Sequence, residues 1–159
     1  MESYQGSADF IAVCSAAKNR TAASRIIRQL QSEKLRVWVA DKGFNAQRRE
    51  DLERLSQCRT ALILVSKQWL ADENCVNQLR AASALERQTV LLFLDETDLN
   101  GVETVQSALN RSMRMISYQQ DSDEWVKELK TLDCVTDCLL QDSEQPEMKK
   151  VSLRSFFRR

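Results

Sequence analysis

The most constraining feature of this sequence is an uninterrupted apolar run from Ala61 to Val65, in the middle of the chain. A sheet with one face in water needs alternating polar and apolar side chains, and this run has no such alternation. We therefore expect a strand that is buried on both faces, at the centre of a parallel sheet. The chain then breaks at Ser66, crosses a polar loop that carries Trp69, and resumes a helical pattern at Cys75. This loop should lie at the carboxyl edge of the sheet, where open α/β sheets bind ligands and partners.

The spacing of the apolar runs predicts alternating strands and helices. The five runs are Phe10–Cys14, Val37–Ala40, Ala61–Val65, Val90–Leu94 and Met113–Ile116. Their starts lie 23 to 29 residues apart, which leaves room for a helix between successive strands and is too long for a hairpin. The expected fold class is α/β, a doubly wound five-stranded parallel sheet with helices on both faces.

Apolar residues recur with helical spacing between the predicted strands, over residues 22–30, 52–58, 76–85 and 125–140. Thr21 is the expected N-cap of the first helix, because its hydroxyl can accept a hydrogen bond from the first turn. An acidic first turn at 121–124 suits the start of the last helix. The connection 95–112 is the least regular, and we expect only a short helix there.

Composition excludes several classes of function. The 159 residues suit one domain, and the 23 basic residues balance the 23 acidic ones, which argues against a nucleic-acid-binding surface. The three glycines are not spaced as a dinucleotide or phosphate loop. Histidine is absent, which removes every histidine-based catalytic triad. No apolar stretch approaches the roughly 18 residues of a membrane span, and the N-terminus does not resemble a signal peptide.

The five cysteines are not arranged as a metal site. They are Cys14, Cys58, Cys75, Cys134 and Cys138. A zinc site without histidine would require four thiolates, and no second close pair accompanies the last two. We expect reduced thiols that pack as small hydrophobic groups, which predicts a cytoplasmic protein without a metal.

The turn after the second strand, Asp41 to Ala46, combines a glycine, a charged pair and a phenylalanine. One interpretation is a plain strand-to-helix turn in which Gly43 adopts a positive φ. The other is a protruding contact loop, in which Phe44 is exposed among polar residues as a binding hot spot.

The ends of the chain differ from the middle, and we expect an N-terminal extension over 1–8, a domain over 9–142 and a basic-aromatic tail over 143–159. The tail residues with contact potential are Lys149, Lys150, Arg154, Phe156, Phe157, Arg158 and Arg159. The tail is either a flexible segment without a fixed role or a weak contact with an anionic membrane or a protein partner.

Five segments occur in an order and with a spacing that are found together in one family. They are Asp9–Ser15, Leu35–Asp41, Ser56–Ser66, Trp69–Leu79 and Trp125. The second resembles that family's strand leading into its BB loop, and the fourth resembles its Trp-Cys-x-x-Glu helix start. From about Asp9 to Leu132, the chain resembles a Toll/interleukin-1 receptor (TIR) domain, which implies a flavodoxin-like fold.

The sequence departs from the TIR pattern where function is concerned. The BB loop lacks the usual Pro-Gly, and Asn74 replaces the tryptophan before Cys75. In TIR domains that hydrolyse NAD, the reactive carboxylate is the glutamate of Trp-Cys-x-x-Glu, and Gln78 occupies that position. An amide neither stabilises a developing oxocarbenium ion with a negative charge nor acts as a base. Gln78 is then either a solvated helix residue or a partner contact.

The resemblance implies a non-enzymatic signalling or adaptor module that associates with other TIR domains in innate-immune-type signalling, with no catalytic residue and no cofactor. The residues expected to bind partners are Asp41, Lys42, Gly43, Phe44, Asn45 and Trp69. The alternative is a TIR NAD hydrolase, or an NAD- or nucleotide-binding TIR domain, that uses a different acid.

Overall fold

A five-stranded parallel sheet forms the centre of the protein. The computed structural model describes residues 2–40, 43–141 and 148–150. The strands lie in the order β3 (Val37–Val39), β2 (Ile11–Cys14), β4 (Thr60–Val65), β5 (Gln88–Phe93) and β6 (Arg114–Ser117). Every neighbouring pair in this sheet is parallel. The predicted α/β sheet is therefore confirmed, and each predicted strand coincides with an observed one within two residues.

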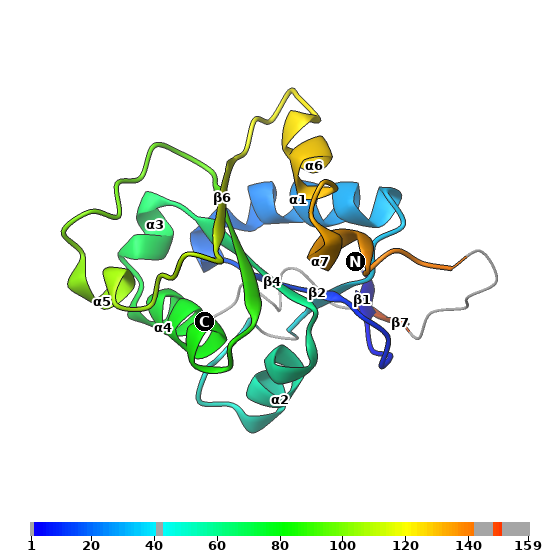
Figure 1. The fold of residues 1–159 in the computed structure, drawn as a ribbon, viewed down its shortest axis with the longest axis horizontal. Helices are drawn as coiled ribbons and strands as arrows, with labels where there is room; N and C mark the ends of the chain where they lie inside the picture. Colours follow the sequence, from blue (N-terminus) through cyan, green and yellow to red (C-terminus); the bar gives the residue numbers. More distant parts are fainter. Residues whose placement is uncertain (1, 41–42, 142–147, 151–159) are drawn as a thin grey trace.

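Helices cover both faces of the sheet. They are η1 (Ala17–Asn19), α1 (Arg20–Ser32), α2 (Arg49–Gln57), α3 (Lys67–Leu70), α4 (Glu73–Ala84), α5 (Glu103–Gln106), α6 (Glu124–Leu129) and α7 (Asp133–Thr136). Figure 1 shows α1 and α6 on one side of the edge-on sheet and α2 and α4 on the other. This arrangement is the doubly wound one that the alternating pattern predicts.

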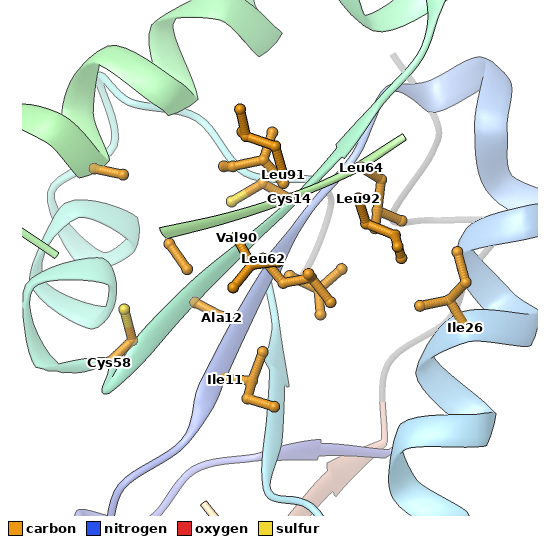
Figure 2. Packing of buried hydrophobic residues seen from close by; sticks show 14 of the residues in the cluster. Ile11, Ala12, Cys14, Ile26, Cys58, Leu62, Leu64, Val90, Leu91 and Leu92 are labelled. Carbon is orange, nitrogen blue, oxygen red and sulfur yellow. The ribbon is translucent and has the colours of Figure 1, made fainter. Parts of the chain in front are cut away.

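The core is built around β4, whose six residues are all buried. Leu64 is the register partner of Leu92 on β5, and both lie on the side of the sheet that faces Ile26 of α1 (Figure 2). Leu91 lies on the opposite side, toward α4, because successive side chains of a strand point to opposite faces. The uniformly apolar sequence of β4 is thus explained by helices that exclude water from both faces.

Local structure differs from the prediction after β4, where the chain enters a helix and not a polar loop. Ser66 is the N-cap of α3, and its Oγ accepts a hydrogen bond from the backbone N–H of Trp69 at 3.0 Å. Asp72 caps α4 in the same way, by accepting from the backbone N–H of Asn74 at 3.0 Å. Two successive side-chain caps therefore turn the chain back toward the sheet within a few residues.

Two other helix predictions are wrong in detail. Thr21 lies inside α1, and Asn19 occupies its N-cap position without a side-chain cap hydrogen bond, because η1 leads directly into α1. The single helix predicted over 125–140 is two short helices, α6 and α7. The short helix expected in 95–112 is α5.

The N-terminal residues pack against the domain. In the segment predicted as an extension, β1 (Glu2–Tyr4) pairs antiparallel with β7 (Met148–Lys150), which falls in the segment predicted as the tail. The buried Ser3 Oγ donates to Val39 O at 2.9 Å and accepts from Val39 N at 2.8 Å. Arg54 donates to Tyr4 O at 2.9 Å. The division into extension, domain and tail stays a prediction.

Ile63→Ala should destabilise the protein by about 2–5 kcal/mol, because Ile63 is fully buried in β4 and its truncation leaves a cavity that the packed sheet cannot close. Urea unfolding measures the free energy. Met115→Ala is the control, since Met115 is 56% exposed and should change stability by no more than about 0.5 kcal/mol. Equal effects of the two substitutions would show that β4 is not the centre of the core.

Candidate functional site

The carboxyl ends of β2 and β4 form the edge of the sheet where a ligand or partner is expected. The chain leaves β2 toward β3 on one side and returns to β4 on the other, which makes this edge the topological switch point. A cleft of about 560 Å³ lies here, between η1 and the start of α4. Its charged lining residues are Lys18, Lys67, Asp72 and Glu73. We refer to it as the carboxyl-edge cleft.

One hydroxyl joins the two loops that border this cleft. Ser66 Oγ donates to Asn19 Oδ1 at 2.6 Å while it accepts from Trp69 N. Ser15 lies at the end of β2, and its buried Oγ has no hydrogen-bond partner among the described residues. The polar side chains of Ser66 and Asn19 at this edge are therefore fixed by hydrogen bonds, which suits a preformed site.

Phe44 points inward, in contrast to the sequence prediction. Its side chain is 2% exposed and packs edge-to-face against Trp38, with ring centroids 6.5 Å apart. The expectation of an exposed Phe44 is wrong, because the loop turns this ring into the core beside β3. Gly43 has a φ of 82°, so the positive φ predicted for a strand-to-helix turn is confirmed.

A network of polar groups fixes the loop that contains Phe44. Asp51 Oδ2 accepts from Asn45 N at 2.8 Å and from Arg48 Nη1 at 3.0 Å. Arg48 Nη1 also donates to Gly43 O at 3.1 Å. Burial raises the pKa of the Asp51 carboxyl, and the hydrogen bond from Asn45 and the charge of Arg48 oppose that shift. The loop backbone is thus bound to the first turn of α2.

Two amide side chains of α4 hold the same loop from the other side. Asn74 Nδ2 donates to Phe44 O at 3.1 Å, and Gln78 Nε2 lies 3.5 Å from the same oxygen as a second donor. Gln78 is fully buried, and its Oε1 has no hydrogen-bond partner within the described ranges. The interpretation of Gln78 as a solvated helix residue is therefore wrong.

The chemistry of this contact requires a donor. The Phe44 carbonyl oxygen only accepts hydrogen bonds, and an ionised carboxylate also only accepts them. A glutamate at position 78 in this conformation would place its charge against that oxygen, without water to solvate it. The amides of Asn74 and Gln78 match the carbonyl, and their i, i+4 spacing places both on one face of α4. That spacing is the one sequence signal for this pair of donors.

The remaining predicted contact residues are distributed differently. Trp69 is fully buried and its Nε1 has no partner in the described part of the chain, so the implied surface position is wrong. Gly43 is buried and Asn45 is half-buried. Lys149 is exposed in β7, which also contains Lys150. The other predicted contacts lie outside the described residues: Asp41, Lys42, Arg154, Phe156, Phe157, Arg158 and Arg159.

All five cysteines are free thiols, and four of them are buried. Burial raises the pKa of Cys58 to about 12 and also raises the pKa values of Cys14 and Cys138. Cys134 is the half-exposed one. Within residues 2–40, 43–141 and 148–150, acidic and cysteine side chains form no group that could hold a metal ion. No helix in these ranges is long and apolar enough to cross a membrane.

Comparison with known protein families identifies the family of this chain. A sequence model described as the TIR domain matches residues 11–132. The chain belongs to the TIR-domain family. A search of curated protein sequences found no match. The crystal structure of the TIR domain of the Toll-related receptor TRR-2 from Hydra magnipapillata is similar, with a TM-score of 0.58 and 9% identity. The match covers 76% of this chain and 94% of that one, and it shows a shared fold alone.

In this TIR domain, Gln78→Glu should destabilise the fold by about 2–3 kcal/mol at pH 7, the equivalent of a pKa raised by about two units. Burial raises the folded-state pKa of an introduced carboxyl above its unfolded value. The penalty is therefore present at neutral pH, where the unfolded state is ionised, and disappears as the pH falls toward about 4. Urea unfolding of variant and wild type at each pH measures the difference.

Asn77→Asp is the control, because it adds the same charge to a half-exposed position of the same helix. It should cost much less and show little pH dependence. A Gln78→Glu variant that is as stable as wild type at pH 7 would contradict the buried donor role of Gln78.

Proposed function

We propose that this TIR domain is a non-enzymatic signalling or adaptor module, which acts through association with other TIR domains in innate-immune-type signalling. The observation that carries the proposal is the position of Gln78. Its amide is fully buried and lies 3.5 Å from the Phe44 carbonyl oxygen. By the resemblance to NAD-hydrolysing TIR domains, Gln78 stands where they carry the reactive carboxylate, and here it contacts the loop.

The chemistry of NAD cleavage supports this proposal. Breaking a glycosidic-type bond develops positive charge at the ribose, which an enzyme stabilises with a carboxylate. Gln78 has no charge at any ordinary pH, and its burial beneath Phe44 keeps it from a bound substrate. Both the residue type and its contacts therefore favour a role in shaping the loop.

The loop then offers a preformed polar surface for association. The backbone of residues 43–45 is fixed by Asp51, Arg48 and the two α4 amides, so little entropy is lost there when a partner binds. The exposed residues next to it are polar, and include Gln47, Arg49 and Glu50. A polar, ordered surface of this kind suits reversible association between TIR domains. The proposal includes a cytoplasmic location.

The second candidate function is NAD hydrolysis, or NAD or nucleotide binding, with a different acid. The observation in its favour is that Asp72 and Glu73 line the carboxyl-edge cleft. Glu73 is exposed, and the Asp72 carboxylate already accepts the capping hydrogen bond from Asn74 N. This candidate therefore requires a substrate that organises these groups on binding, whereas the adaptor proposal requires no such change.

The double substitution of Asp41→Ala and Lys42→Ala should weaken self-association about tenfold, or about 1.4 kcal/mol, and leave the thermal melt unchanged. Sedimentation velocity over a concentration series measures the association. Arg28→Gln is the control, since Arg28 is exposed on α1, away from the loop. A double variant that associates as tightly as wild type would contradict the assignment of this loop.

Phe44→Ala is expected to behave differently from the loop variant. Because Phe44 is buried against Trp38, its truncation should cost about 3–5 kcal/mol of stability. Loss of association would then follow from loss of the loop conformation. Thermal denaturation distinguishes the two, and an unchanged melt for Phe44→Ala would show that the ring does not anchor the loop.

A further inference from the structure

A second pocket lies at the opposite, amino-terminal edge of the sheet. It has a volume of about 390 Å³ and is bordered by the starts of β4, β5, β6 and α7. Three arginines line it, Arg59, Arg111 and Arg114. We refer to it as the basic pocket. It lies at the far end of the strands from the carboxyl-edge cleft and shares no lining residue with it.

The sheet register brings these arginines together. In the parallel pairing of β4 with β5, Thr60 is opposite Gln88, and in the pairing of β5 with β6, Val90 is opposite Arg114. The three strands therefore begin at nearly the same level. Arg59 directly precedes β4 and Arg111 lies three residues before β6, so residues distant in sequence meet at this edge.

The pocket carries an excess of positive charge. Arg59 Nε is paired with Asp137 Oδ2 at 3.1 Å. Arg111 and Arg114 are exposed and form no side-chain hydrogen bond or ion pair among the residues that the structure describes. Asp133 is the one acidic residue in the lining. Two arginines of the lining thus have no carboxylate partner among the described residues, although the chain as a whole has no net charge.

Other arginines of the protein show what a structural role looks like. Arg54 donates to Tyr4 O at 2.9 Å and to Gly6 O at 2.8 Å, and it lies 3.8 Å over the Phe10 ring. Within the part of the chain that the structure describes, Arg111 and Arg114 have no such contacts. Like charges that line one pocket raise its electrostatic free energy, and a bound dianion would lower it.

We propose that the basic pocket binds the phosphate group of a small phosphorylated molecule. A planar guanidinium presents its donors as a fork that fits two phosphate oxygens at once. The volume of about 390 Å³ falls in the range of small-molecule sites, roughly 300–1,000 Å³. It is larger than a lone phosphate requires, so the phosphate carries an organic group, such as a nucleoside or a sugar.

Cys134 provides a reporter for binding. It lines the basic pocket and is half-exposed, whereas the other four cysteines are buried. A thiol reagent applied to the folded protein should therefore modify Cys134 first, which mass spectrometry can verify. A ligand in the pocket covers the thiol and slows the reaction in proportion to the unoccupied fraction of the protein.

The experiment measures the labelling rate of Cys134 in the full chain with adenosine monophosphate, glucose 6-phosphate or inorganic phosphate, each against chloride at equal ionic strength. The rate should fall roughly tenfold when the phosphate compound is at about nine times its dissociation constant. The double substitution of Arg111→Gln and Arg114→Gln should abolish this protection. Both side chains are exposed, so the variant should fold, and circular dichroism checks this.

Arg28→Gln is the matched control, because it removes the same charge from an exposed position on α1, and it should keep full protection. Protection by either ester supports the proposal and identifies the organic group. The proposal would be overturned if chloride protected Cys134 equally well, or if inorganic phosphate were the only one of the three compounds to protect it. Protection that persisted in the double variant would also overturn it. Equal labelling rates with and without all three compounds would also overturn it.

Discussion

Burial of β4 on both faces is the constraint on which the rest of this structure depends. All six residues of β4 are buried, so helices must cover both sides of the sheet. Its two neighbouring strands run parallel to it, as is typical of sheets that are covered on both faces. The order of β3, β2, β4, β5 and β6 then creates a switch point between β2 and β4. The same parallel alignment places the starts of three strands at the other edge. Both candidate sites of the molecule are consequences of one apolar strand.

The carboxyl edge is shaped by the pairing of amides with a backbone carbonyl. Asn74 and Gln78 are donors to the oxygen of Phe44, and the Phe44 ring is buried on the other side of the same loop. The side chain and backbone of one residue are therefore held at once. A glutamine at position 78 therefore suits this edge, because its amide can donate a hydrogen bond to the loop.

The fold could be predicted from the sequence, but the directions in which loop side chains point could not. Strands such as Ala61–Val65 were predictable because burial on two faces leaves an unbroken apolar pattern. Phe44 was predicted to be exposed because its neighbours are polar, but a loop has no periodicity to reveal which side chain turns inward. The burial of Gln78 depends on that loop, so it could be inferred only from the i, i+4 relation with Asn74. The basic pocket has no signal in the sequence, because Arg59 and Arg114 are distant in the chain and are brought together by sheet register.

The central proposal is that this TIR domain works by contact and does not cleave NAD. The decisive measurement is nicotinamide release from NAD by the purified full chain, over protein concentrations that span its self-association. We expect that association rises with protein concentration while nicotinamide stays at the level of a protein-free blank. Release that grows in proportion to time and protein, and that is lost in the Glu73→Gln variant, would contradict it.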